Sequence, residues 1–169
     1  MEEDTQDPQA YILYGNEERV KGDPAKAVEA YEKALENFDI TDKQQLAGIY
    51  FCLGDAYRRL GKGIEAMTSY SNGIAINKYY RDNYYGLGYI LYASKLYDMA
   101  IGVLEEALLT SHRFFFWMED NFTWTYAMYS LLGSAYFEVG NIEKAFINAS
   151  KALQFESTNP VLLKNFNEY

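Results

Sequence analysis

Apolar residues recur along the chain at the spacing of amphipathic helices, in segments separated by short polar turns. Four stretches align without gaps: ILYGNEERVKGDPAKAVEAYEKAL, FCLGDAYRRLGKGIEAMTSYSNGI, YGLGYILYASKLYDMAIGVLEEAL and SLLGSAYFEVGNIEKAFINASKAL. Each stretch contains two segments of helical length with one turn between them. The pattern therefore predicts four helical hairpins and no strands.

Small residues stand at equivalent positions in all four units. The position seven residues before each turn holds Gly15, Gly54, Gly88 and Gly133, and the position five residues after it holds Ala27, Ala66, Ala100 and Ala145. Two antiparallel helices approach most closely where a large side chain would hold their backbones apart. We therefore expect these residues at the helix crossings.

The turn inside each hairpin carries its own signal. Gly22, Gly61 and Gly140 stand where a first helix must end, and glycine accepts the left-handed backbone conformation of such stops. Unit three has Lys95 at this position, which predicts a looser hairpin there. Pro24 suits the first turn of the helix that follows it.

This pattern resembles the tetratricopeptide repeat, a helical hairpin of about 34 residues. The step from Gly54 to Gly88 is 34 residues, whereas the step before it is longer by 5 and the step after it by 11. The resemblance covers about residues 8–157. It implies an all-α solenoid of tetratricopeptide type, a right-handed superhelix whose concave side is lined by the first helix of each hairpin.

The predicted organisation follows from these spacings. It consists of a mobile acidic tail at 1–7, hairpins at 8–38, 44–77, 79–111 and 120–156, an aromatic insertion near 111–124, and a cap helix at 158–169. Asn159 and Pro160 predict the start of the cap helix. An apolar face on that helix would cover the open end of the solenoid, and its expected members are Leu162, Leu163, Phe166 and Tyr169.

Charge and residue chemistry exclude several classes of function. The net charge is −9, and most of it falls in residues 1–39, whereas nucleic-acid backbones and anionic membrane surfaces are bound by basic surfaces. Cys52 and His112 have no partners at catalytic or metal-ligand spacing. We expect neither an enzyme nor a metal or cofactor site, and the single cysteine favours a reducing, cytoplasmic compartment.

The face expected to line the groove contains aromatic and charged residues. Tyr85, Tyr89 and Tyr92 share one helical face, and they form either an open aromatic floor or a contact with a neighbouring helix. Asp55 and Arg59 favour a solvated ion pair. The full set of candidate partner-binding residues is Asn16, Arg19, Phe51, Asp55, Arg58, Tyr85, Tyr89, Tyr92, Ser134 and Phe137.

Two further features bear on partners. Chaperone-binding members of the family clamp a terminal carboxylate, and of the matching positions here, Ile12, Asn16, Cys52, Asp82 and Gly86, only Asn16 fits. The aromatic insertion forms either a local core or a docking patch. The candidate residues of that patch are Phe114, Phe115, Phe116, Trp117 and Trp124.

These observations predict a non-catalytic scaffold that binds a protein or peptide segment in a concave aromatic groove. Residues 116–160 also resemble tetratricopeptide regions attached to bacterial and phage glycosyltransferases. That weaker resemblance implies, as an alternative, an accessory module that positions such an enzyme or its acceptor. Self-assembly into a homo-oligomer through the aromatic insertion is a third hypothesis.

Overall fold

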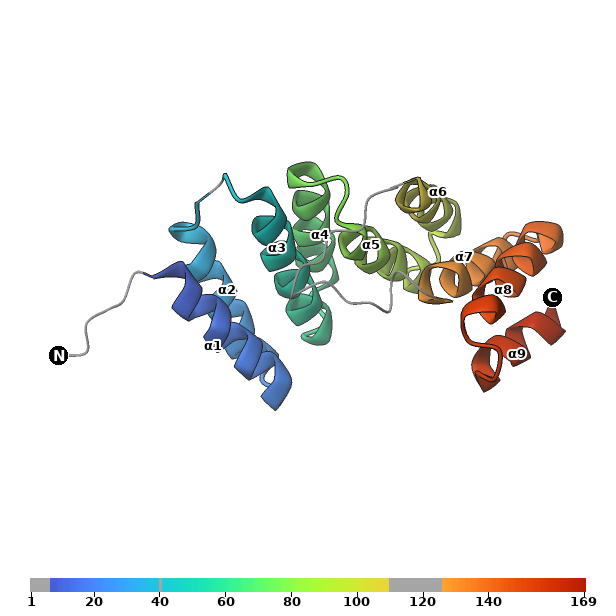
Figure 1. The fold of residues 1–169 in the computed structure, drawn as a ribbon, viewed down its shortest axis with the longest axis horizontal. Coiled ribbons are helices and arrows are strands. Elements are labelled where there is room, and N and C mark those ends of the chain that lie inside the picture. Colours follow the sequence, from blue (N-terminus) through green and yellow to red (C-terminus); the bar gives the residue numbers. More distant parts are fainter. Residues whose placement is uncertain (1–6, 40, 110–125) are drawn as a thin grey trace.

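The computed structural model describes residues 7–39, 41–109 and 126–169. Over these ranges the chain is helical without strands, and the helices succeed one another along the long axis of the molecule, with the two ends far apart (Figure 1). The helices are α1 (Pro8–Lys21), α2 (Pro24–Glu36), α3 (Lys43–Arg59), α4 (Gly63–Ile76), α5 (Arg81–Ala93), α6 (Tyr97–Leu108), α7 (Tyr126–Glu138), α8 (Ile142–Phe155) and α9 (Pro160–Glu168). The predicted all-α fold of four hairpins and a C-terminal helix is confirmed.

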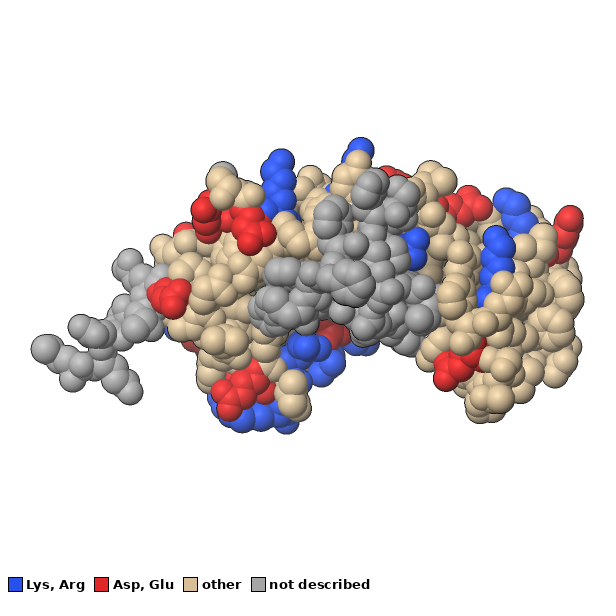
Figure 2. Space-filling view, viewed as in Figure 1, with Lys and Arg blue, Asp and Glu red and all other residues tan. Residues whose placement is uncertain are grey.

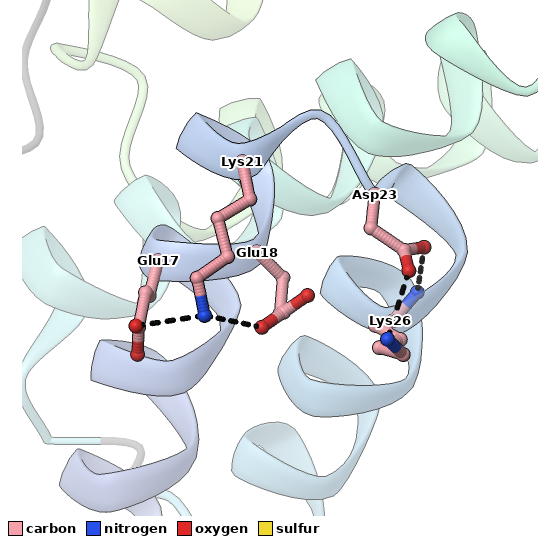
Figure 3. A network of polar contacts seen from close by, with 5 residues as sticks. All are labelled: Glu17, Glu18, Lys21, Asp23 and Lys26. Atoms are coloured by element: carbon pink, nitrogen blue, oxygen red, sulfur yellow. Dashed lines mark hydrogen bonds and ion pairs between the residues drawn. The ribbon is translucent and has the colours of Figure 1, made fainter.

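Two aspartates begin the first hairpin's helices. The Asp7 carboxylate accepts a hydrogen bond of 2.9 Å from the backbone N–H of Gln9, so Asp7 caps α1 rather than belonging to a mobile tail. Asp23 caps α2 in the same way through the backbone N–H of Lys26, and its carboxylate also pairs with the Lys26 ammonium (Figure 3). Both caps satisfy N–H groups that a helix start leaves without partners.

The turns inside the hairpins have the expected left-handed backbone. The φ angles are +86° at Gly22, +73° at Gly61 and +79° at Gly140. Lys95 adopts the same conformation with a φ of +62°, although its Cβ makes this conformation costly. The third hairpin therefore keeps the common turn geometry. Its backbone is strained at Lys95, the position at which the other three hairpins have glycine.

Glycines in the first helices permit close helix crossings. A Cβ added to Gly15 would lie 2.7 Å from the Tyr31 ring, and one added to Gly54 would lie 2.6 Å from the Tyr70 ring. Gly88 faces Leu104 in the same way, at 2.7 Å. These contacts confirm the predicted role of the small residues.

The hairpins stack so that the first helices α1, α3, α5 and α7 form one layer, each beside the next. One hydrophobic core joins the first two hairpins through Ile12, Tyr31 and Ile49, and a second joins the last two through Leu104 and Met128. Buried polar contacts fix the register between hairpins: the Asn83 amide donates to the carbonyl of Ala47 at 2.9 Å. The stacked first helices are thus held as one continuous surface.

Helix α9 covers part of the last hairpin. Leu162 is buried, and the Phe166 ring lies 4.7 Å from the ring of Phe146 on α8. Leu163 departs from the prediction, since it is 41% exposed. Phe155 at the end of α8 is 53% exposed and stacks on Tyr129.

The predicted aromatic insertion lies outside the described residues, together with His112 and residues 1–6. Within the described ranges, none of the helices has the length and apolar character needed to cross a membrane. On the face shown in Figure 2, acidic and basic groups are both spread along the molecule, and acidic groups are prominent over the first hairpin. This distribution agrees with the acidic balance of the sequence.

Candidate partner-binding surface

The predicted groove residues fall on the layer of first helices, but the structure divides them into two separate groups. The first group, here called the arginine–tyrosine patch, consists of Asn16, Arg19, Asp55, Arg58, Tyr85 and Tyr89 on α1, α3 and α5. The second, here called the α7 subsite, consists of Ser134 and Phe137. Phe51 and Tyr92 belong to neither group because both pack against other rings.

Arg58 is the centre of the arginine–tyrosine patch. Its Nη2 atom lies 2.5 Å from the Asp55 carboxylate, and its guanidinium carbon lies 5.5 Å from the centroid of the Tyr89 ring. The Tyr89 ring in turn lies 6.5 Å from that of Tyr85. A guanidinium held over an aromatic face is attracted by the ring quadrupole, so these contacts orient Arg58 before any partner arrives.

The predicted pair of Asp55 and Arg59 forms, with 2.9 Å between carboxylate oxygen and Nε. It is not solvated as expected, because the Asp55 side chain is only 13% exposed while that of Arg59 is 41% exposed. One buried carboxylate therefore serves two arginines. Asp55 therefore holds both arginines of α3, and the Arg58 side chain remains 36% exposed.

The α1 part of the patch has hydrogen-bond donors that are not used. The Tyr31 hydroxyl donates to the Asn16 carbonyl oxygen at 2.8 Å, but the Asn16 side-chain N–H₂ group is buried without a partner. The Nε of Arg19 is likewise buried without a partner. Burial also raises the pKa of Tyr31, which keeps its hydroxyl protonated.

Phe51 and Tyr92 pack against other aromatic rings. The Phe51 ring lies 6.1 Å from Tyr70 and 6.4 Å from Tyr80, in a packed aromatic group. The Tyr92 ring lies 5.4 Å from that of Tyr97, and burial raises the pKa of Tyr92. Among the three tyrosines of α5 expected in the floor, only Tyr89 is exposed, at 41%.

The α7 subsite is covered by a residue that sequence reasoning did not place there. The Tyr169 ring stacks on Phe137 with 4.7 Å between centroids, and its hydroxyl lies 3.0 Å from that of Ser134. Tyr169 was predicted to face the last hairpin as part of an apolar stripe. The sequence carries no signal for its precise neighbour, because the direction of α9 relative to α7 is a tertiary feature.

The positions matching a chaperone carboxylate clamp are mostly inside the protein. Ile12 and Asp82 are fully buried, Cys52 is 2% exposed, and Gly86 is buried. Burial raises the pKa of the Cys52 thiol to about 11, so it is neither a nucleophile nor a free ligand in the folded chain. Across the described part of the chain, no group of three acidic, histidine or cysteine side chains is arranged to hold a metal ion.

A pocket that sequence reasoning missed lies on the other side of the last two hairpins. It has a volume of about 650 Å³ between α6, α7 and α8. Its polar residues interact with one another: the Tyr136 hydroxyl bonds to Glu105, and the Lys144 ammonium donates to the same hydroxyl at 2.9 Å. Glu105, Tyr136 and Lys144 therefore form one hydrogen-bonded group in the wall of this pocket.

Comparison with known proteins supports the repeat assignment. Residues 8–37 match the family model of the tetratricopeptide repeat. No curated protein matches the chain. The resemblance to regions attached to glycosyltransferases therefore stays a prediction.

Solved structures share the fold at low identity. A chain of the Cut9–Hcn1 hetero-tetramer of the APC/C has a TM-score of 0.75 and 20% identity over 96% of this chain, which spans 29% of that chain. YrrB, a tetratricopeptide-repeat protein with an unusual peptide-binding site, has a TM-score of 0.72 and 18% identity over 95% of this chain and 75% of YrrB. The first such domain of Spaghetti (RPAP3), bound to an HSP90 peptide, has a TM-score of 0.64 and 19% identity over 73% of this chain and 90% of that chain.

Proposed function

We propose that this tetratricopeptide-repeat chain is a non-catalytic scaffold that binds an extended segment of a partner protein on the arginine–tyrosine patch. Two similar structures, YrrB and Spaghetti, are peptide-binding proteins, which supports a protein or peptide as the class of partner. The residues proposed for contact are those of the stacked first helices α1, α3 and α5.

The arrangement of Arg58 carries this proposal. Asp55 fixes the guanidinium from one side and Tyr89 from the other, so binding loses little side-chain freedom at this residue. Arginine and tyrosine are also among the residue types that most often dominate the energy of protein interfaces. An exposed pair of these residues, already oriented, is suited to anchor a partner.

The chemistry of the patch indicates what the partner presents. The Arg58 side chain is 36% exposed, and its guanidinium carries several N–H donors. Backbone carbonyls and acidic side chains of an extended segment supply acceptors for such donors. The Tyr89 ring offers an apolar face to the side chains between them.

Substitution of Arg58 and Tyr89 tests the proposal. Proteins captured by the wild-type chain from an extract of its native host are identified by mass spectrometry, and purified candidates are titrated against Arg58→Ala and Tyr89→Ala. Each variant should weaken binding by about tenfold or more, because truncation of an interface anchor costs on the order of 2 kcal/mol.

Tyr14→Ala is the matched control, since Tyr14 is a 44% exposed tyrosine on α1 outside the patch. Thermal melts must accompany each titration. Tyr89→Ala should melt within about 2 °C of wild type, because trimming an exposed side chain changes stability by about 0.5 kcal/mol or less. If both patch variants bind as wild type does, the partner uses another face and the proposal fails.

A further inference from the structure

The residue that follows α9 reaches α7 in the layer of first helices, whereas α9 itself packs on α8. Tyr169 follows the last residue of α9, and its backbone N–H still bonds to the carbonyl of Asn165 at 3.1 Å. Its ring lies against Phe137, and the same hydrophobic core packs against Tyr85, Tyr92 and Tyr169. The chain therefore places one of its own side chains on α7, the first helix beside α5 of the arginine–tyrosine patch.

The contacts of Tyr169 use both parts of a tyrosine side chain. The ring stacks on Phe137 with an interplanar angle of 28°, and the hydroxyl pairs with Ser134 at 3.0 Å. Phe137 nevertheless remains 37% exposed, and Tyr169 is only half-buried. The α7 subsite thus holds the phenol ring of Tyr169 at a partly exposed surface and not in a buried core.

Helix α9 does not depend on this ring for its attachment. Leu162 is its buried anchor, and Phe166 contacts Phe146 on α8. The side-chain oxygen of Asn159 caps the start of the helix. Rotation of the Tyr169 side chain can therefore vacate the subsite while α9 stays in place.

We propose that Ser134 and Phe137 form a binding site for a tyrosine side chain of the partner segment, and that Tyr169 occupies this site as an intramolecular competitor. The inference rests on the proposed function, since α7 lies beside α5, which carries Tyr85 and Tyr89 of the arginine–tyrosine patch. Exchange of one phenol for another preserves both the ring stack and the hydroxyl contact. It therefore leaves no polar group unsatisfied.

Competition from Tyr169 makes the α7 subsite selective for segments that contain a tyrosine. A segment without a tyrosine gains nothing by displacing Tyr169, because it cannot replace both contacts. A segment with a tyrosine at the right distance from its contacts with Arg58 gains a second anchor. The Tyr169 ring lowers the affinity for every segment that uses the α7 subsite, because only molecules in which this ring has left the subsite can bind there.

Peptide pools of defined composition test this proposal without a known partner. Two synthetic pools have randomised flanks and carry either tyrosine or alanine at the central position. Each is passed over the immobilised full chain, and the retained amounts are expressed as a tyrosine-to-alanine ratio. The ratio should be about tenfold higher for Tyr169→Ala than for wild type, because a vacant subsite offers a ring stack and a hydrogen bond, together worth about that factor.

Two variants show whether the subsite itself causes the gain. Tyr169→Ala combined with Ser134→Ala should lose the preference for the tyrosine pool over a third pool that carries phenylalanine at the central position. Tyr169→Ala combined with Phe137→Ala should lose the preference for either aromatic pool over the alanine pool. Tyr14→Ala, which removes a half-exposed tyrosine on α1, should leave the ratio at the wild-type value. Circular dichroism confirms that each variant is folded.

An equal ratio for wild type and Tyr169→Ala overturns the proposal, and so does a raised ratio that persists without Ser134 and Phe137. Failure of the proposed function gives a different result. In that case Arg58→Ala and Tyr89→Ala retain both pools as wild type does, whatever the effect of Tyr169→Ala.

Discussion

Substitution of Gly54 by alanine tests how this sequence brings its helices together. An added Cβ would lie 2.6 Å from Cε1 and 2.8 Å from Cδ1 of the Tyr70 ring, closer than carbon atoms approach without displacement. Tyr70 is 1% exposed, and its ring also lies against Gly86, where an added Cβ would lie 2.4 Å from it. The ring is therefore buried and packed closely against two glycine backbones.

Two opposing effects set the change in the free energy of unfolding caused by Gly54→Ala. Alanine is a better helix former than glycine by about 0.5–1 kcal/mol, which stabilises the variant. Overpacking of a filled core costs about 1–3 kcal/mol because helices or side chains must shift. The clash dominates, so the net loss should be about 1–2 kcal/mol, which lowers the melting temperature by about 2–8 °C for a chain of this size.

Gly102→Ala is the matched control. Gly102 lies inside α6, and an added Cβ there would meet no atom within 4 Å. This variant should be stabilised by about 0.5–1 kcal/mol through helix propensity alone. Thermal and urea unfolding followed by circular dichroism measure both variants. If Gly54→Ala melts at or above the wild-type temperature, close approach of α3 and α4 at Gly54 is not what the packing requires.

Two other predictions concern the backbone and the buried thiol. Lys95→Gly should raise stability by up to about 1 kcal/mol because glycine adopts a φ of +62° without strain, whereas Gly140→Ala should lose a similar amount at +79°; equal urea midpoints would contradict this. Burial raises the pKa of Cys52 from 9.0 to about 11, so the unfolded chain releases this proton at lower pH than the folded chain does. Stability from this thiol is therefore complete below about pH 9 and declines as pH rises toward 11. Urea unfolding at about pH 8 and about pH 10 should show a smaller decline for Cys52→Ala than for wild type; identical declines would show that the thiol contributes nothing.

The hairpins could be predicted from the sequence because their signals are local. A left-handed turn needs a residue that tolerates positive φ, and glycine stands there in three of the four units. A helix crossing needs a small residue, and it recurs seven positions before each turn. Such requirements repeat at a fixed interval, so they are visible without knowledge of what packs on what.

The candidate surface was less predictable because exposure depends on neighbours from distant parts of the chain. Tyr85, Tyr89 and Tyr92 share a helical face by spacing, yet only Tyr89 remains open, since Tyr92 packs on Tyr97 across the turn. The pair of Asp55 and Arg59 was visible from spacing as well. Its burial was not, because that depends on how α1 and α5 enclose α3.

The sequence by itself determined the repeated hairpin and the residues at its turns and crossings. These features depend on backbone conformation and on contacts within about one repeat. Only the tertiary structure decided that Arg58 is held between Asp55 and Tyr89, and that Tyr169 covers Ser134 and Phe137. The contact of Arg58 with Tyr89 and the contacts of Tyr169 with Ser134 and Phe137 join different elements, and their geometry is set by the stacking of hairpins and by the direction of α9. No local pattern in the chain encodes that direction, because it emerges only when the last apolar faces pack together.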